Sequence, residues 1–101
     1  MSDREYVKST IECVKEVTEL FYQQKKEEGL EKLNNATSMM MESIELIIKQ
    51  KDNGIEINEE KILSSLRDSM EALEKGDFVL VADILQYDFL EYIEEILDNI
   101  Q

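Results

Sequence analysis

The sequence lacks histidine, proline and tryptophan entirely, and it has only one cysteine and three glycines among 101 residues. Without histidine, the commonest general base and the Ser-His and Cys-His nucleophile pairs are missing. We therefore expect no enzyme, no catalytic residue, no metal site and no cofactor. The single cysteine, Cys13, excludes an internal disulfide. It falls on the apolar side of the first expected helix, where a small buried thiol is the usual outcome.

Long hydrophobic runs are also missing, since no stretch approaches the roughly 20 apolar residues that span a bilayer. The amino-terminal MSDREYVKS is charged from its third residue, which is unlike a signal peptide. These features predict a cytoplasmic protein. With 43% hydrophobic and 35% charged residues, residues 1–101 should form a single helical domain rather than a disordered chain.

Positive charge is scarce, and the formal net charge is −13. Residues 51–101 carry 4 basic and 14 acidic side chains, and no basic side chain follows Lys75. Such a surface repels phosphate backbones and anionic lipid, so nucleic acid and membranes are poor partners. The acidity either serves solubility or complements a cationic partner.

Helix-ending signals divide the chain into four segments. Gly29, Gly54 and Gly76 each follow polar or charged residues typical of a last helical turn. Ser2 or Asp3, Asn58 and Asp77 are suitable helix starts. The predicted helices lie near 3–28, 30–52, 58–75 and 77–100, and the short Gly76–Asp77 junction predicts an antiparallel hairpin. The expected fold is all-α, an up-down antiparallel four-helix bundle.

Apolar residues at spacings of three and four support each helix. The third helix is expected to bury Ile62, Leu63, Leu66, Met70 and Leu73, and the fourth Phe78, Ala82, Leu85, Phe89, Ile93, Ile96 and Ile100. The stretch IIKQKDNGIEIN also resembles a hairpin of two strands about Asn53–Gly54. A lone hairpin is only marginally stable, so we retain the helical interpretation.

The stretch GDFVLVADILQYDFL has more apolar residues than one core face needs. The surplus includes Leu80, Ile84 and Tyr87, beside the acidic Asp88, Glu91 and Glu95, and the second helix has a similar surplus at Met39 and Leu46. These residues either widen the core or bind another protein. Our hypothesis is a protein-interaction surface for a second copy, giving a homodimer, or for a cationic amphipathic helix.

Two polar features were weighed as sites. A calcium loop about Gly54 fails because Lys49 and Lys51 would take ligand positions, and Asp88, Glu91 and Glu95 are better explained as a solvated acidic face. Asp83 interrupts the apolar run of the fourth helix. If it is buried, we expect Arg67 or Lys61 to pair with it.

Three resemblances extend this interpretation. Asp68-Ser69-Met70 resembles the Asp-Ser-Leu/Met site of acyl carrier proteins, which implies phosphopantetheine on Ser69, although Ser69 lies inside the periodic run ILSSLRDSMEAL. The segment EKGDFVLVADILQYDFLEYIEEI, about a quarter of the chain, is similar to a group of small uncharacterised bacterial helical proteins, which implies a helical fold. In size and acidity the chain is also similar to secretion and flagellar export chaperones, which implies shielding of a client's amphipathic helix.

Overall fold

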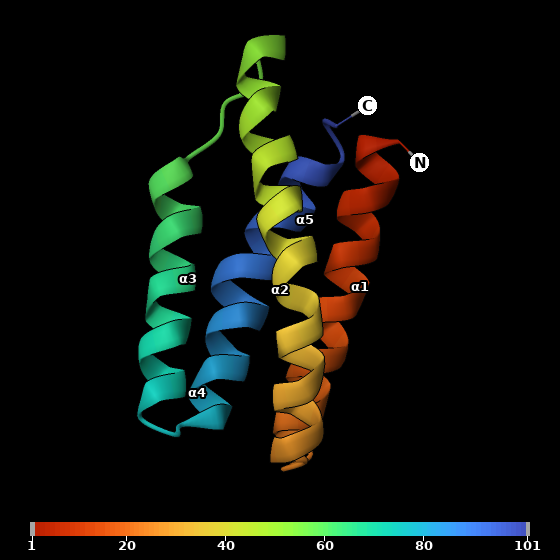
Figure 1. Cartoon of the computed structure of the whole chain (residues 1–101). Helices are drawn as coiled ribbons and strands as arrows, with labels where there is room; N and C mark the ends of the chain where they lie inside the picture. Colours follow the sequence, from red (N-terminus) through yellow and green to blue (C-terminus); the bar gives the residue numbers. More distant parts are fainter. Residues whose placement is uncertain (1, 101) are drawn as a thin grey trace.

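The computed structural model describes residues 2–100 and shows an all-α up-down bundle of four long helices (Figure 1). The first three helices are α1 (Asp3–Tyr22), α2 (Lys26–Lys49) and α3 (Glu59–Glu74), with a short 3₁₀ turn η1 (Gln50–Asn53) after α2. The fourth runs without interruption through α4 (Phe78–Asp83), η2 (Ile84–Leu90) and α5 (Glu91–Leu97). The predicted fold class is confirmed, and residues 2–100 contain no strand.

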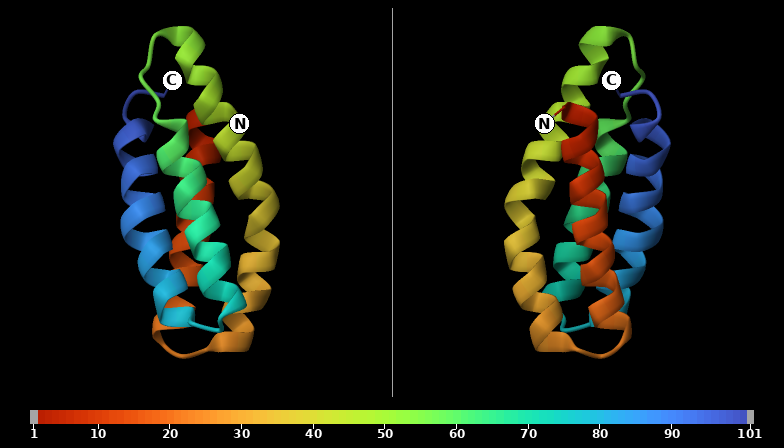
Figure 2. Two further views of the ribbon diagram at one scale, coloured as in Figure 1. Left: turned by 90° about the vertical axis from the view of Figure 1, so that its left-hand side faces the viewer. Right: turned by 90° about the vertical axis from the view of Figure 1, so that its right-hand side faces the viewer.

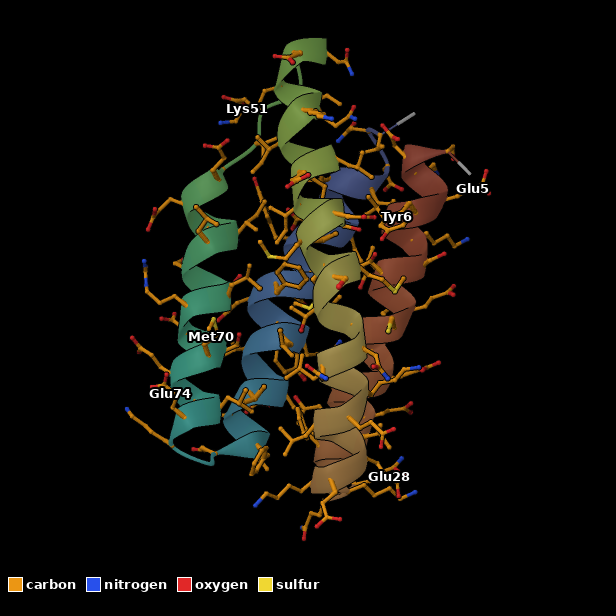
Figure 3. All side chains as sticks on the ribbon, viewed as in Figure 1. Glu5, Tyr6, Glu28, Lys51, Met70 and Glu74 are labelled. Carbon is orange, nitrogen blue, oxygen red and sulfur yellow. The ribbon has the colours of Figure 1, made fainter. Side chains whose placement is uncertain are left out.

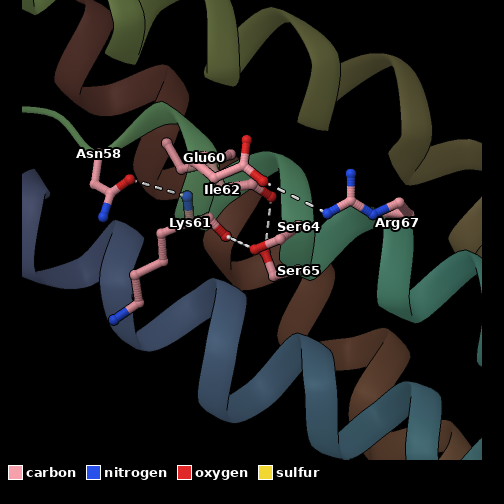
Figure 4. A network of polar contacts seen from close by, with 7 residues as sticks. All are labelled: Asn58, Glu60, Lys61, Ile62, Ser64, Ser65 and Arg67. Atoms are coloured by element: carbon pink, nitrogen blue, oxygen red, sulfur yellow. Dashed lines mark hydrogen bonds and ion pairs between the residues drawn. The ribbon is translucent and has the colours of Figure 1, made fainter.

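The helix starts follow local capping chemistry. The side chains of Ser2, Asn58 and Asp77 each accept a hydrogen bond from a backbone N–H three residues later, at 3.1 Å. Each bond satisfies one N–H that the first helical turn leaves without a partner. Figure 4 shows the Asn58 cap and the polar contacts of the following two turns of α3. The three starts were predicted correctly because capping involves neighbours in sequence.

The turn between α1 and α2 corrects one predicted boundary. The chain reverses at 23–25, where Gln24 has a φ of 63°, and Gly29 lies inside the first turns of α2. A Cβ built at Gly29 would lie 2.5 Å from Cδ1 of Phe21. Gly29 is therefore required for close packing and does not end a helix, whereas Gly54 and Gly76 do end helices with φ of 83° and 72°.

The fourth helix contains a π-helical segment, η2, that changes which residues reach the core. In an uninterrupted α-helix, Leu90 would be rotated about 140° from Leu85 and would face solvent. In a π-helix, hydrogen bonds join residues five apart, so Leu90 lies above Leu85. Both side chains are buried, together with Phe89. The wider turn therefore accommodates part of the surplus apolar side chains in the core.

The buried face of α3 differs from the prediction. Ile62 is buried as expected, but the other buried residues are Ser65, Ser69 and Ala72. These small side chains let α3 approach the fourth helix closely, and the hydroxyls of Ser65 and Ser69 donate to carbonyls of their own helix at 2.8 Å. Two of the five predicted core residues, Leu63 and Met70, are exposed, and Leu66 and Leu73 are half-buried.

The packing of the helices is uneven as a consequence. α1 packs closely along α2 and along the fourth helix, whereas α3 packs on α4 and η2 and makes few contacts with α1 or α2. Figure 1 shows α3 at one edge of the bundle beside α4. The side views show the connection through residues 50–58 at one end of the molecule and the two short turns at the other (Figure 2). The bundle is therefore open between α2 and α3.

Candidate functional site

An apolar groove of about 370 Å³ lies between α2 and α3, and we call it the α2–α3 groove. Its α2 wall includes Leu30, Leu33 and Met41, and its α3 wall includes Leu66, Met70 and Leu73. Met40 of α2, with Val81 and Leu85 of the fourth helix, completes the apolar part of the lining. The volume falls in the range of about 300–1,000 Å³ that is typical of ligand sites, which also are mostly apolar.

The lining of the groove contains three polar residues and no charged one. They are Asn34, Thr37 and Ser69. The hydroxyls of Thr37 and Ser69 donate to the carbonyls of Leu33 and Leu66, at 2.9 Å and 2.8 Å. Only the Asn34 amide is left without a hydrogen bond within residues 2–100. The groove can therefore bind apolar groups, but its side chains offer no acid or base for a reaction.

Exposed methionines form the two lips of the groove. Met41 on α2 is 54% exposed, and Met70 on α3, labelled in Figure 3, is 63% exposed. Leu63, two turns before Met70 on α3, is 48% exposed and extends that lip. The sequence interpretation missed this site because it assigned Leu63 and Met70 to the core. The sequence does contain a signal for this site. Ser65, Ser69 and Ala72 repeat at the same spacings of three and four on another face of α3, and burial of that face leaves Leu63 and Met70 exposed.

The predicted interaction residues of the fourth helix divide between surface and core. Leu80 is 42% and Tyr87 58% exposed, whereas Ile84 is only 9% exposed and packs in the core. Ile84 belongs to the buried core cluster, so this residue is removed from the candidate surface. Asp88, Glu91 and Glu95 are exposed and make no salt bridge within residues 2–100.

The predicted residues of the second helix lie elsewhere. Met39 and Leu46 are half-buried. The Met39 carbonyl accepts a hydrogen bond from Thr10 Oγ1 of α1 at 3.4 Å, and Leu46, seven residues later, is on the same side of α2. This side faces α1 and not the α2–α3 groove. The structure therefore does not combine Met39 and Leu46 with Leu80 and Tyr87 in one surface.

Asp83 is held by a residue that the sequence did not suggest. The Tyr22 hydroxyl of α1 donates to Asp83 Oδ1 at 2.5 Å. The two expected partners are engaged elsewhere: Arg67 pairs with Glu60 at 3.5 Å, and Lys61 lies over the Tyr92 ring (Figure 4 shows the Arg67 pair). Partial burial, and then the hydrogen bond to Asp83, raise the pKa of Tyr22 above its ordinary value.

Two alternative sites receive no support from the geometry. Ser69 is buried in the middle of α3 and donates to the Leu66 carbonyl, so it does not resemble the exposed serine that opens a helix in acyl carrier proteins. Within residues 2–100, no three histidine, cysteine or acidic side chains come together in a way that could hold a metal ion. No helix in this part of the chain has the length and apolarity to cross a bilayer.

Comparison with protein families assigns the chain to one of them. Residues 4–99 match the profile of the family described as Domain of unknown function (DUF8042), and the chain belongs to this family. The match covers nearly the whole bundle, including both walls of the groove. The comparisons with curated proteins and with solved structures gave no match.

Proposed function

We propose that this protein is a non-catalytic protein-binding module whose α2–α3 groove receives the apolar side of an amphipathic helix from another protein. The observation that carries the proposal is the open seam between α2 and α3, where Met41 and Met70 are exposed beside an uncharged apolar lining. A helix laid between two helices is a recurring mode of recognition, and it uses apolar anchors at spacings of three, four and seven. Methionine lips suit such a groove because their flexible thioethers adapt to different anchors.

The length of the groove supports a helical occupant. On α2 the wall extends from Leu30 to Met41, which is about 16 Å along the helix axis. A partner helix of about three turns covers this distance and presents three apolar side chains to the groove. The proposal therefore specifies a short helical segment rather than a large flat interface.

Another protein is favoured over a second copy of this chain. Each copy carries a net charge of −13, so two copies repel one another. If the exposed Leu80 and Tyr87 of one copy entered the groove of another in a head-to-tail arrangement, the copies would build rings or open chains rather than a two-fold dimer. An export chaperone that shields an amphipathic helix of its client would use the groove in the same way.

The resemblance of residues 74–96 to small bacterial proteins supports a bacterial source, and the single cysteine is compatible with the reducing cytoplasm.

The test uses a labelled peptide of about 18 residues built from leucine and glutamine, with the leucines at helical three-and-four spacing. A peptide of equal composition with alternating leucines is its control. Fluorescence anisotropy should show binding of the helical peptide alone. Met70→Glu should abolish that binding, whereas Leu80→Glu, an equal charge change at an exposed apolar residue outside the groove, should not. Equal effects of the two variants, or no binding of either peptide, would contradict the proposal.

Size exclusion with light scattering tests self-association on the same samples. A monomer that binds the helical peptide is the expected result. A stable dimer that Met70→Glu dissociates would instead assign the groove to a second copy.

A further inference from the structure

We infer that the helix bound in the α2–α3 groove is basic at both ends, with a lysine or arginine about one turn beyond its apolar anchors, and that Glu45 and Glu74 recognise these cations. This inference rests on the proposed function and specifies the partner of the same groove. It is argued from the charges that border the apolar lining.

Glu45 and Glu74 lie directly beyond the two methionine lips. Glu45 follows Met41 by one helical turn on α2, and Glu74 follows Met70 by one turn on α3, so each carboxylate continues the edge that its methionine begins. Both are exposed, and neither makes a salt bridge within residues 2–100. Because α2 and α3 run antiparallel, the two carboxylates border opposite ends of the groove.

Three of the cations near the groove already have partners. Arg67, on the α3 edge, pairs with Glu60 at 3.5 Å (Figure 4). Lys51, beyond the end of α2, pairs with Glu59 at 3.1 Å, and the Lys26 ammonium lies over the Phe78 ring at 5.0 Å from its centroid.

Lys49 and Lys75 are exposed and make no salt bridge within residues 2–100, but Lys49 lies two turns beyond Met41 and Lys75 follows the last residue of α3. The charged residues one turn beyond the methionine lips at the border of the groove are the two carboxylates, Glu45 and Glu74. A cationic helix is the electrostatic complement of this border, and an acidic helix is repelled.

The magnitude of this selectivity follows from the exposure of the carboxylates. Exposed ion pairs contribute about 0.2–1 kcal/mol each, and 1.4 kcal/mol corresponds to a tenfold change in affinity. Two such pairs should strengthen binding of a basic helix by about two- to thirtyfold at low salt, and screening should remove most of this gain at about 1 M salt. The apolar anchors supply the remaining affinity, which salt does not weaken.

The experiment compares three peptides with identical leucines. One has glutamine, one lysine and one glutamate at the two positions that lie one turn beyond the anchors. The lysine peptide should bind about two- to thirtyfold tighter than the glutamine peptide, and the glutamate peptide should bind most weakly. In the protein Glu45→Gln/Glu74→Gln, the lysine peptide should lose its advantage while the glutamine peptide binds unchanged. The control Glu12→Gln/Glu19→Gln removes the same charge from exposed positions of α1 and should preserve the advantage.

Each outcome separates this inference from the proposed function. If the glutamine peptide binds but the lysine peptide is no tighter, the inference is wrong and the helix-binding groove stands. If the advantage falls equally in both double variants, the net charge of the whole protein attracts the peptide, and Glu45 and Glu74 have no specific role. If none of the peptides binds, both the inference and the proposed function are wrong.

Discussion

The aromatic ring of Phe21 occupies the space in which a side chain at position 29 would begin. A Cβ at Gly29 would lie 2.5 Å from both Cδ1 and Cε1 of the ring, and Phe21 itself is buried. The contact joins the end of α1 to the start of α2 across the turn at 23–25. The close approach of these two helices therefore depends on the absence of a side chain at a single residue.

Gly29→Ala should lower the free energy of unfolding by about 1–3 kcal/mol, because overpacking displaces the buried ring. In an unhindered helix the same change would instead stabilise the protein by about 0.5–1 kcal/mol. Urea unfolding measures the difference. Ser38→Ala, at an exposed position of α2, serves as the control and should change little. A more stable Gly29→Ala protein would show that Phe21 can move aside at no cost.

The buried hydrogen bond between Thr10 Oγ1 and Ser43 Oγ, at 2.7 Å, should respond asymmetrically to its two partners. Ser43→Ala leaves Thr10 a second acceptor, the Tyr6 carbonyl at 3.1 Å, so it should cost only about 0.5–1.5 kcal/mol. Thr10→Val leaves the buried Ser43 hydroxyl without this partner and should cost about 1–3 kcal/mol. The double variant should be more stable than Thr10→Val alone. Urea unfolding of all four proteins checks this order, and equal costs of the two single variants would contradict it.

Deleting Tyr87 should leave the bundle folded. Tyr87 is exposed within η2, and the π segment accommodates one residue more than an α-helix would over the same length. Without it the helix can become α throughout while Phe89 and Leu90 keep their buried positions. Deleting Glu12, which is exposed in α1, should instead rotate Val14 and Val17 by about 100° and unfold the protein. Circular dichroism melting compares the two deletions, and similar losses would contradict the role assigned to η2.

The Tyr22–Asp83 hydrogen bond should make stability decline at high pH. The pKa of Tyr22 is raised above the ordinary value of 10.0, so above pH 10 the folded state retains a proton that the unfolded state loses. The stability that the Tyr22–Asp83 hydrogen bond contributes is therefore complete below pH 10. It is lost as the pH rises toward the pKa that Tyr22 has in the folded state. Tyr22→Phe should be less stable than the native protein at about pH 8, and the difference should narrow by about pH 11.

Urea unfolding at these two pH values provides the measurement. Lysine deprotonation affects both proteins and cancels in the comparison. The control Ser38→Ala, at an exposed position of α2, changes no titratable group, so its difference in stability from the native protein should be the same at both pH values. A constant gap between the native protein and Tyr22→Phe would argue against the raised pKa.

Much of the fold could be predicted from the sequence because its signals are local. The caps at Asn58 and Asp77 place the starts of the third and fourth helices within a few residues, and the left-handed glycines at 54 and 76 do the same for the ends of the second and third. The end of the first helix could not be placed in this way. Gly29 has the appearance of a helix stop, and only the position of the Phe21 ring reveals its packing role.

The candidate site was harder to predict because helical spacing identifies a helix but does not choose its buried face. In α3, both the row through Leu63 and Met70 and the row through Ser65 and Ser69 repeat every three or four residues. Hydropathy favours burial of the first row, but the small residues of the second permit a closer helix contact. The surplus of the fourth helix posed a related difficulty, since a fixed 3.6-residue period does not anticipate a π segment that buries Ile84 and Leu90.

The one-sided attachment of α3 has a consequence for how the molecule opens. Three of its four buried residues, Ser65, Ser69 and Ala72, are small, and Ile62 is the fourth, so its seam with the fourth helix buries little apolar area, whereas α1 is packed along helices on two sides. Backbone amides of α3 should therefore exchange with solvent deuterium earlier than those of α1, by an opening that leaves the rest of the bundle intact. One wall of the groove would then belong to the least protected helix, so an occupant that bridges α2 and α3 should slow amide exchange in α3 more than in α1.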